Sequence, residues 1–292
     1  MRRAALVLAV VVGVACSGGG GDGSGGGRGR EAKPVDGPED VALPRSPAQT
    51  AASLVRVERA LRTPQTRPAE INRLGWEQQN AYRALTAHPD WLPRVLPKLP
   101  ADVQPIVTAN ERAGRDLEAL GGEGPRPRHH PDWHIVSPLP VEVLRSYYAE
   151  AEAATGIPWA YFASIHLVET RLGRIRGTSS AGAQGPMQFI PETWARYGQG
   201  DINDNRDAIL AAGRLLQANG APGDVSRALF RYNNSDRYVE AVESYAQLML
   251  SDERAFLGYY QWQVYSATTK GTFLLPEGYP SKAARRVTPS SG

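Results

Sequence analysis

Cysteine is almost absent from this chain, since Cys16 is its single one. One thiol cannot form a disulfide within the chain, which excludes an internal crosslink. A long apolar segment is missing as well. The apolar run Ala4–Ala15 is shorter than the roughly 20 residues that span a bilayer as a helix. Because Arg2 and Arg3 precede this short run, we expect an export signal at residues 1–15.

Charge of one sign is equally scarce. The chain has 33 Lys and Arg against 30 Asp and Glu, a formal net charge of +3. Apart from the first residues and short pieces such as Arg171–Arg176, its basic residues form no block of the kind that follows a phosphate backbone. This balance argues against a nucleic-acid partner.

The segment Gly13-Val14-Ala15-Cys16 is similar to the lipobox of bacterial lipoproteins, although a larger aliphatic residue is usual in place of Gly13. In that family the signal is cleaved before the cysteine, and the thiol receives a lipid. The resemblance implies lipidation at Cys16 and an exported protein anchored to the outer face of the cell membrane, facing the wall. The alternative is an ordinary signal peptide with an incidental cysteine.

Two segments of different character follow. Residues 16–45 are nearly all Gly, Ser, Pro and charged residues without apolar periodicity, which predicts a flexible tether with a reach of about 30 Å. In residues 46–120 apolar residues recur at helical spacing between prolines, which predicts a small helical subdomain. We find no motif for catalysis or ligand binding in this subdomain. Its role stays open, and it is a candidate surface for partners in a cell-wall complex.

The rest of the chain divides after a linker rich in Gly, Pro, Arg and His at residues 121–131. Residues 132–252 are strongly helical, with Thr155-Gly156 as a helix stop. Residues 253–292 contain two apolar runs around Thr269-Lys270-Gly271, which predicts a small C-terminal β-hairpin and a tail. The fold class is therefore mainly α.

Two patterns suggest a metal, but neither meets the requirements of a site. Residues 129–134 contain three histidines and an aspartate in one proline-broken connector, with no second cluster to converge on it. We expect a solvated linker whose Trp133 packs on the domain. The loop Asp201–Asn205 begins like a calcium loop, yet Arg206 and Ala212 stand where Gly and a bidentate Glu are needed. We therefore expect no metal and no other cofactor.

Glu169 is the candidate acid. It lies on a helix that Pro158 begins, with Ile165 one turn before it and Leu172 almost one turn after it. Apolar neighbours solvate a carboxylate poorly, which raises its pKa and keeps the group protonated near neutral pH, as a general acid requires. Taken alone, a Glu beside an apolar stripe is more often a solvated edge residue.

Three segments, in this order along the chain, support Glu169 as the acid. They are His166–Gly173 around Glu169, then Gly182–Pro191, then Tyr232-Asn233-Asn234. Together they resemble three motifs of the lytic transglycosylase family, namely the helix with the catalytic Glu, the Gly-x-Met-Gln loop and the Tyr-Asn motif. The resemblance covers roughly residues 132–250, under half of the chain.

The resemblance implies a goose-type lysozyme-like helical domain with a groove for peptidoglycan glycan strands. It implies that Glu169 protonates the β-1,4 bond after MurNAc and then, as carboxylate, removes the proton of the C6 hydroxyl, which leaves a 1,6-anhydro end. The chain departs from the family pattern at Thr170, where Ser is usual, and at Pro186, where Leu is common. The implied substrate-binding residues are Thr170, Ser180, Met187, Gln188, Phe189, Tyr232 and Asn233. Gly182 and Gly185 would let a sugar approach the main chain.

Two other functions stay open. A lysozyme-type hydrolase on the same fold would ordinarily need a second carboxylate, for which Asp201, Asp204 and Asp236 are candidates because none occurs between Glu169 and Glu192. A non-catalytic wall-binding lipoprotein would hold glycan without cutting it, but binding alone does not require a buried acid.

Overall fold

The computed structural model describes residues 37–121 and 125–287. The expected export signal, Cys16 and most of the expected tether lie outside the described residues. Within the described ranges, no helix combines the length and the apolar character that crossing a membrane requires.

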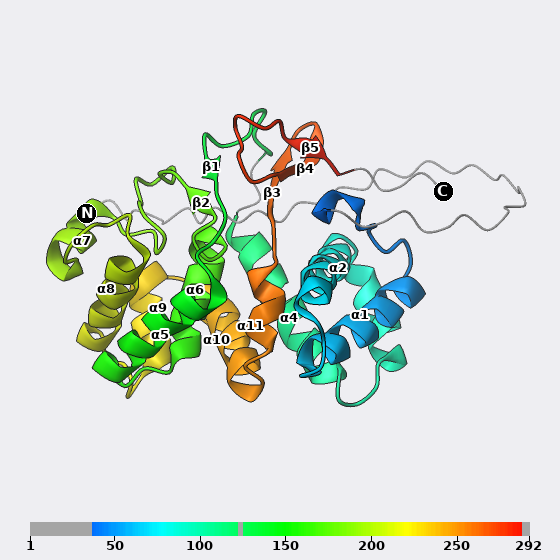
Figure 1. The fold of residues 1–292 in the computed structure, drawn as a ribbon, viewed down its shortest axis with the longest axis horizontal. Coiled ribbons are helices and arrows are strands. Elements are labelled where there is room, and N and C mark those ends of the chain that lie inside the picture. Colours follow the sequence, from blue (N-terminus) through cyan, green and yellow to red (C-terminus); the bar gives the residue numbers. More distant parts are fainter. Residues whose placement is uncertain (1–36, 122–124, 288–292) are drawn as a thin grey trace, which may run out of the picture.

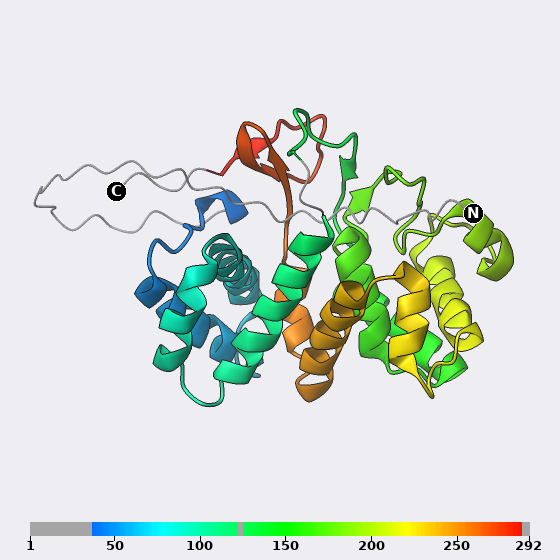
Figure 2. The ribbon, with the colours of Figure 1, turned by 180° about the vertical axis from the view of Figure 1, so that it is seen from behind.

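The protein is mainly α-helical, as the sequence predicts (Figures 1 and 2). Its α-helices are α1 (Pro47–Arg62), α2 (Pro68–Ala87), α3 (Leu92–Val95), α4 (Gln104–Leu120), α5 (Val141–Thr155), α6 (Trp159–Thr170), α7 (Pro191–Tyr197), α8 (Asn205–Ala218), α9 (Val225–Asn233), α10 (Asp236–Ser251) and α11 (Ala255–Tyr260). Short 3-10 helices are η1 (Pro38–Asp40), η2 (Pro89–Trp91) and η3 (Leu96–Lys98). The strands are β1 (His134–Ile135), β2 (Ile175–Arg176), β3 (Val264–Thr268), β4 (Gly271–Leu275) and β5 (Arg285–Arg286).

Local signals set several helix ends. Asp204 caps α8, because its side chain accepts a hydrogen bond from the Asp207 amide at 3.0 Å. Helix α5 ends before Gly156, which has the left-handed conformation at φ 72°. Ser235 stands at the N-cap of α10, but its side chain makes no capping hydrogen bond.

One hydrophobic core joins the two helical regions. Helix α10 packs against α4 from the first region and against α6 from the second, and Figure 2 shows α4 and α10 side by side. Buried apolar residues of this core include Leu54 on α1, Val107 on α4, Leu144 on α5 and Val242 on α10. Residues 46–120 thus pack directly on the helices that follow. Their status as a separate domain stays a prediction.

The strands gather at one end of the helical body, at the top in Figure 1. β1 pairs with β2, and β3 pairs with β4 across Thr269-Lys270, with Val264 opposite Leu275, which confirms the expected hairpin. β5 adds a third strand to that sheet. A second small core of Trp133, Ile135, Ile175, Val264 and Leu275 holds the strands together, so Trp133 packs as expected.

The close packing of α2 on α11 leads to a first prediction. A Cβ added to Gly75 would lie 2.5 Å from the Cβ of Gln261 and 2.8 Å from the carbonyl oxygen of Gly258. We expect Gly75→Ala to lower the free energy of unfolding by up to about 2 kcal/mol, because overpacking costs about 1–3 kcal/mol and the gain in helix propensity offsets about 1. Urea unfolding followed by circular dichroism measures this change.

Gly114→Ala on α4 is the matched control. There the nearest atom to an added Cβ is the side-chain oxygen of Thr86, at 3.3 Å. We expect this variant to keep the free energy of unfolding of the wild type or to gain up to about 1 kcal/mol, because the same gain in helix propensity applies at Gly114. Equal unfolding midpoints for the two variants would contradict the close α2–α11 contact.

Candidate active site

Glu169 lies in the last turn of α6, a helix whose residues are all buried. The sequence predicts one apolar stripe on this helix, but α5, α8 and α10 pack around it. Immediately after Thr170 the backbone enters the left-handed region at Arg171 (φ 54°), Leu172 (φ 60°) and Gly173 (φ 79°). The helix therefore stops one residue after Glu169, and the carboxyl is held at its end with 3% of the residue exposed.

Burial raises the pKa of the Glu169 carboxyl to about 8. The hydroxyl of Tyr238 donates a hydrogen bond to its Oε1 at 2.8 Å, which acts in the opposite direction by stabilising the carboxylate. Burial is the stronger effect, so the group carries a proton at neutral pH. A protonated carboxyl with one fixed donor can deliver its proton to a leaving oxygen and then act as a base.

A tight turn at residues 185–188 faces α6. Gln184 and Phe189 exchange two backbone hydrogen bonds of 2.9 Å, and Gly185 and Gln188 have positive φ values of 74° and 49°. The side chain of Gln188 closes the turn, because its Nε2 donates to the Gly185 carbonyl at 2.9 Å. This turn is the predicted Gly-x-Met-Gln loop.

Two successive carbonyls of this turn are held by residues of the other two motifs. The Thr170 hydroxyl donates to the Pro186 carbonyl at 2.6 Å. The Tyr232 hydroxyl donates to the Met187 carbonyl, also at 2.6 Å. The three segments that carry the resemblance in the sequence therefore lie close together in the structure.

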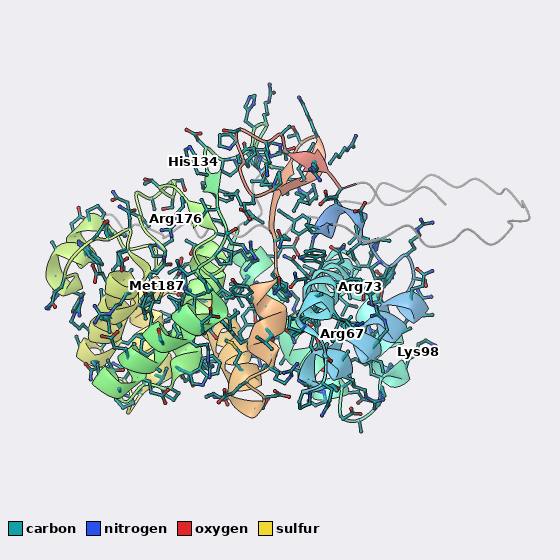
Figure 3. All side chains as sticks on the ribbon, viewed as in Figure 1. Arg67, Arg73, Lys98, His134, Arg176 and Met187 are labelled. Carbon is teal, nitrogen blue, oxygen red and sulfur yellow. The ribbon has the colours of Figure 1, made fainter. Side chains whose placement is uncertain are left out.

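The site lies toward one end of the molecule. In Figure 3, Met187 lies toward the α7–α8 end, whereas Arg67, Arg73 and Lys98 mark the opposite α1–α2 end.

Three of the residues expected to bind substrate are buried. Thr170 and Met187 are fully buried and Phe189 is 2% exposed, and their role in binding stays a prediction. The Phe189 ring contacts the rings of Trp194 and Tyr232 edge-on. Ser180 is exposed on the preceding loop and makes no hydrogen bond to Glu169 in the described part of the chain.

The Tyr-Asn motif lies near the carboxyl. The Tyr232 hydroxyl donates to the Met187 carbonyl, and the Tyr232 ring stacks on Tyr238 at a centroid distance of 6.1 Å. Burial raises the pKa of Tyr232, and the nearby Glu169 carboxylate raises it further. Asn233 is 7% exposed, and its buried amide nitrogen has no hydrogen-bond partner among the described residues.

Tyr238 is the residue that sequence reasoning missed. It is fully buried in the first turn of α10, and its partner Glu169 is 69 residues away in the chain. Helical spacing gave one usable signal, since Tyr238 lies four residues before Val242 and shares its inward face. The pattern alone could not show that the hydroxyl meets a carboxyl.

The three candidates for a second carboxylate lie on the surface. Asp201, Asp204 and Asp236 are exposed, and Asp201 and Asp204 accept hydrogen bonds from nearby backbone amides. None of the three is hydrogen bonded to Glu169 or shifts its pKa. Within the described residues the site thus has one carboxyl at its centre, and no group of three His, Cys, Asp or Glu could hold a metal.

The Tyr238 hydrogen bond leads to a prediction about the acid itself. Removing the donor with Tyr238→Phe destabilises the carboxylate, so we expect the pKa of Glu169 to rise further. The expected rise is on the order of one unit, because a hydrogen bond to a charged group contributes about 1.5–3 kcal/mol and one unit equals about 1.4 kcal/mol. A carbon-13 NMR titration of the carboxyl measures it.

Tyr232→Phe is the control for this titration, since its hydroxyl donates to a backbone carbonyl instead of the carboxyl. We expect a much smaller shift in that variant. An unchanged or lower pKa of Glu169 in Tyr238→Phe would contradict the assigned role of the hydrogen bond.

Comparison with known proteins supports a relationship between this chain and the lytic transglycosylases. One similar protein is the membrane-bound lytic murein transglycosylase F of Thiobacillus denitrificans (strain ATCC 25259 / T1), 29% identical over 121 residues. The alignment takes in 39% of this chain and 26% of that protein, so the chain spans about a quarter of its relative's length. No family model matches the chain, and no solved structure matches it.

Proposed function

We propose that this protein cleaves the glycan strands of peptidoglycan, with Glu169 as the group that transfers the proton. The observation that carries the proposal is the buried carboxyl with a pKa of about 8, held beside the turn that Thr170 and Tyr232 fix. The name of the similar protein, a lytic murein transglycosylase, supports the substrate class.

In the proposed reaction Glu169 donates its proton to the glycosidic oxygen as the bond from that oxygen to C1 of MurNAc breaks. The resulting carboxylate then accepts the proton of the C6 hydroxyl of the same sugar, and O6 forms a new bond to C1. No water is consumed, and Glu169 ends protonated again. Tyr238 stabilises the carboxylate between the two steps through its 2.8 Å hydrogen bond.

A lysozyme-type hydrolase is the second candidate, but it ordinarily uses another carboxylate as base or nucleophile. The single carboxyl at the centre of the described site favours the intramolecular closure. We further propose a goose-type lysozyme-like domain at residues 132–252, together with export and lipidation at Cys16, which would keep the enzyme beside its polymeric substrate.

Mass spectrometry of digested cell-wall material tests the reaction. We expect products ending in 1,6-anhydro-MurNAc, which are 18 Da lighter than hydrolysed ends because no water is added. Products with reducing ends and no anhydro species would identify a hydrolase, and no products at all would favour a non-catalytic wall-binding protein.

A further inference from the structure

A pocket of about 450 Å³ lies where the C-terminal segment and the end of α11 meet α2 and the connection from α6 to β2. Trp76 and Tyr260 contribute aromatic walls, and Arg174, Glu277 and Lys282 contribute charge. Glu169 is not part of the lining. The pocket is therefore a separate feature, although Arg174 follows Glu169 by only five residues.

Arg174 is a buried cation that forms no ion pair among the described residues, although the Glu277 carboxylate lies near enough to raise its pKa. The residue is 7% exposed, and one guanidinium nitrogen donates to the Tyr260 carbonyl at 3.0 Å. The buried Nε has no hydrogen-bond partner in the part of the chain that the structure describes. Within the described ranges no carboxylate lies at ion-pair distance from it. Burial lowers the pKa of Arg174 to about 10, so it remains charged at neutral pH. A buried charge is costly unless it is paired, which makes this guanidinium a position for an anion.

The other charged groups of the lining complete an amphoteric site. Lys282 is exposed and forms no ion pair in the described part of the protein, so it offers a second cation. Arg285 is instead taken up by an ion pair with Glu39. Glu277 is close enough to raise the pKa of Arg174 and offers a carboxylate to an ammonium group. A ligand with both carboxylates and a free amine would match this set.

We propose that the pocket binds the acidic peptide stem that branches from the glycan strand, with Arg174 on a stem carboxylate. The inference rests on the proposed function. Five residues of chain span at most about 18 Å, which limits the distance from Glu169 to Arg174. A stem of four or five residues is about 13–18 Å long when extended, which is comparable with this upper limit. The diamino acid of the stem supplies the amine for Glu277.

Binding of free stem peptide to the full chain tests the inference directly. The probes are L-Ala-γ-D-Glu-diaminopimelate-D-Ala and the same peptide with the D-Glu carboxylate amidated, measured by isothermal titration calorimetry. We expect Arg174→Gln to weaken binding about tenfold or more, since a hydrogen bond to a charged group contributes at least about 1.4 kcal/mol. Lys282→Gln should weaken it about threefold, and amidation should weaken binding to the wild type.

Arg176→Gln is the matched control, because this neighbouring arginine, labelled in Figure 3, donates to the Asn203 carbonyl at 2.9 Å and does not line the pocket. We expect less than a twofold change. Absence of binding by the wild type, or equal binding by all three variants and by the amidated peptide, would overturn the inference. Lys282→Gln and the amidated probe keep the test decisive if Arg174→Gln does not fold.

Cleavage assays separate this inference from the proposed function. We expect Arg174→Gln to lower kcat/KM about tenfold on strands that carry stems and to leave it unchanged on strands stripped of stems by an amidase. If stems bind but neither kind of strand is cleaved, the proposed function fails and the pocket assignment stands. If strands are cleaved while stems do not bind, the pocket assignment fails alone.

Discussion

Glu169→Gln is expected to lower the rate of glycan-strand cleavage by at least about 10³-fold. A glutamine has nearly the same shape but can neither give its proton to a leaving oxygen nor take one from a hydroxyl. General acid–base transfer contributes about 10²- to 10⁴-fold, and the proposed reaction uses the same carboxyl in both directions. Release of soluble fragments from purified cell wall measures the rate. Equal rates for the wild type and the variant would remove Glu169 from the reaction.

The pH dependence of stability provides the control for folding in the same variant. Because burial raises the pKa of Glu169 to about 8, from an ordinary value of 4.5, the folded state holds a proton that the unfolded state releases between these pH values. The wild type therefore loses stability as pH rises through this window, while the glutamine variant is spared that loss. We expect the variant to become the more stable protein by a few kcal/mol at pH 8, at about 1.4 kcal/mol per unit. Thermal unfolding at pH 4.5 and pH 8 measures the difference.

A parallel loss of stability in both proteins between pH 4.5 and 8 would contradict the raised pKa. A less stable variant at pH 8 would indicate that the substitution disturbs α6, and its low activity would then say nothing about proton transfer. The two measurements together distinguish a chemical role for Glu169 from a structural one.

Sequence reasoning reached the parts of the site that local signals encode. Glu169 lies on a helix with apolar neighbours, and Gly156 ends α5, each within a few residues of the local signal that predicts it. Burial of α6 on every side was not predictable in this way. It depends on α5, α8 and α10, which meet only in the folded chain.

The contacts that the sequence did not predict join segments that are far apart along the chain. The Tyr238 hydroxyl reaches Glu169 across 69 residues, and Thr170 reaches Pro186 across 16. Tyr232 and Tyr238 carry the same hydroxyl group, so the sequence cannot show which of the two donates a hydrogen bond to the Glu169 carboxyl. Packing decides this, because Tyr232 is held at the Met187 carbonyl and Tyr238 stacks on its ring.

Gly185 was expected to leave room for a sugar, but the space beside it is filled by the chain itself. A Cβ added there would lie 1.9 Å from the carbonyl oxygen of Ile202 and 2.9 Å from its carbon, and φ is 74°. Both contacts are with backbone, which cannot rotate away. An alanine at this position must therefore move the turn at residues 185–188 or the segment around Ile202.

Gly185→Ala is consequently expected to lower the free energy of unfolding by about 2–5 kcal/mol, from about 1–2 for the left-handed backbone and about 1–3 for the clash. Cleavage should fall about 10²-fold, because the Pro186 and Met187 carbonyls would leave their partners and a shift of about 1 Å near reacting groups has an effect of that size. Urea unfolding and the cell-wall release assay measure the two losses.

Gly182→Ala separates the clash from the backbone effect. Gly182 has a similar φ of 85°, but no atom lies within 4 Å of an added Cβ. We expect this variant to lose only about 1–2 kcal/mol and to keep most of its activity, since the turn stays in place. Equal losses of stability and activity in the two variants would mean that the left-handed backbone conformation alone accounts for the effect of both substitutions. Larger losses of stability and activity in Gly185→Ala than in Gly182→Ala would instead support the role of the Ile202 backbone in fixing the position of the turn at residues 185–188 relative to Glu169.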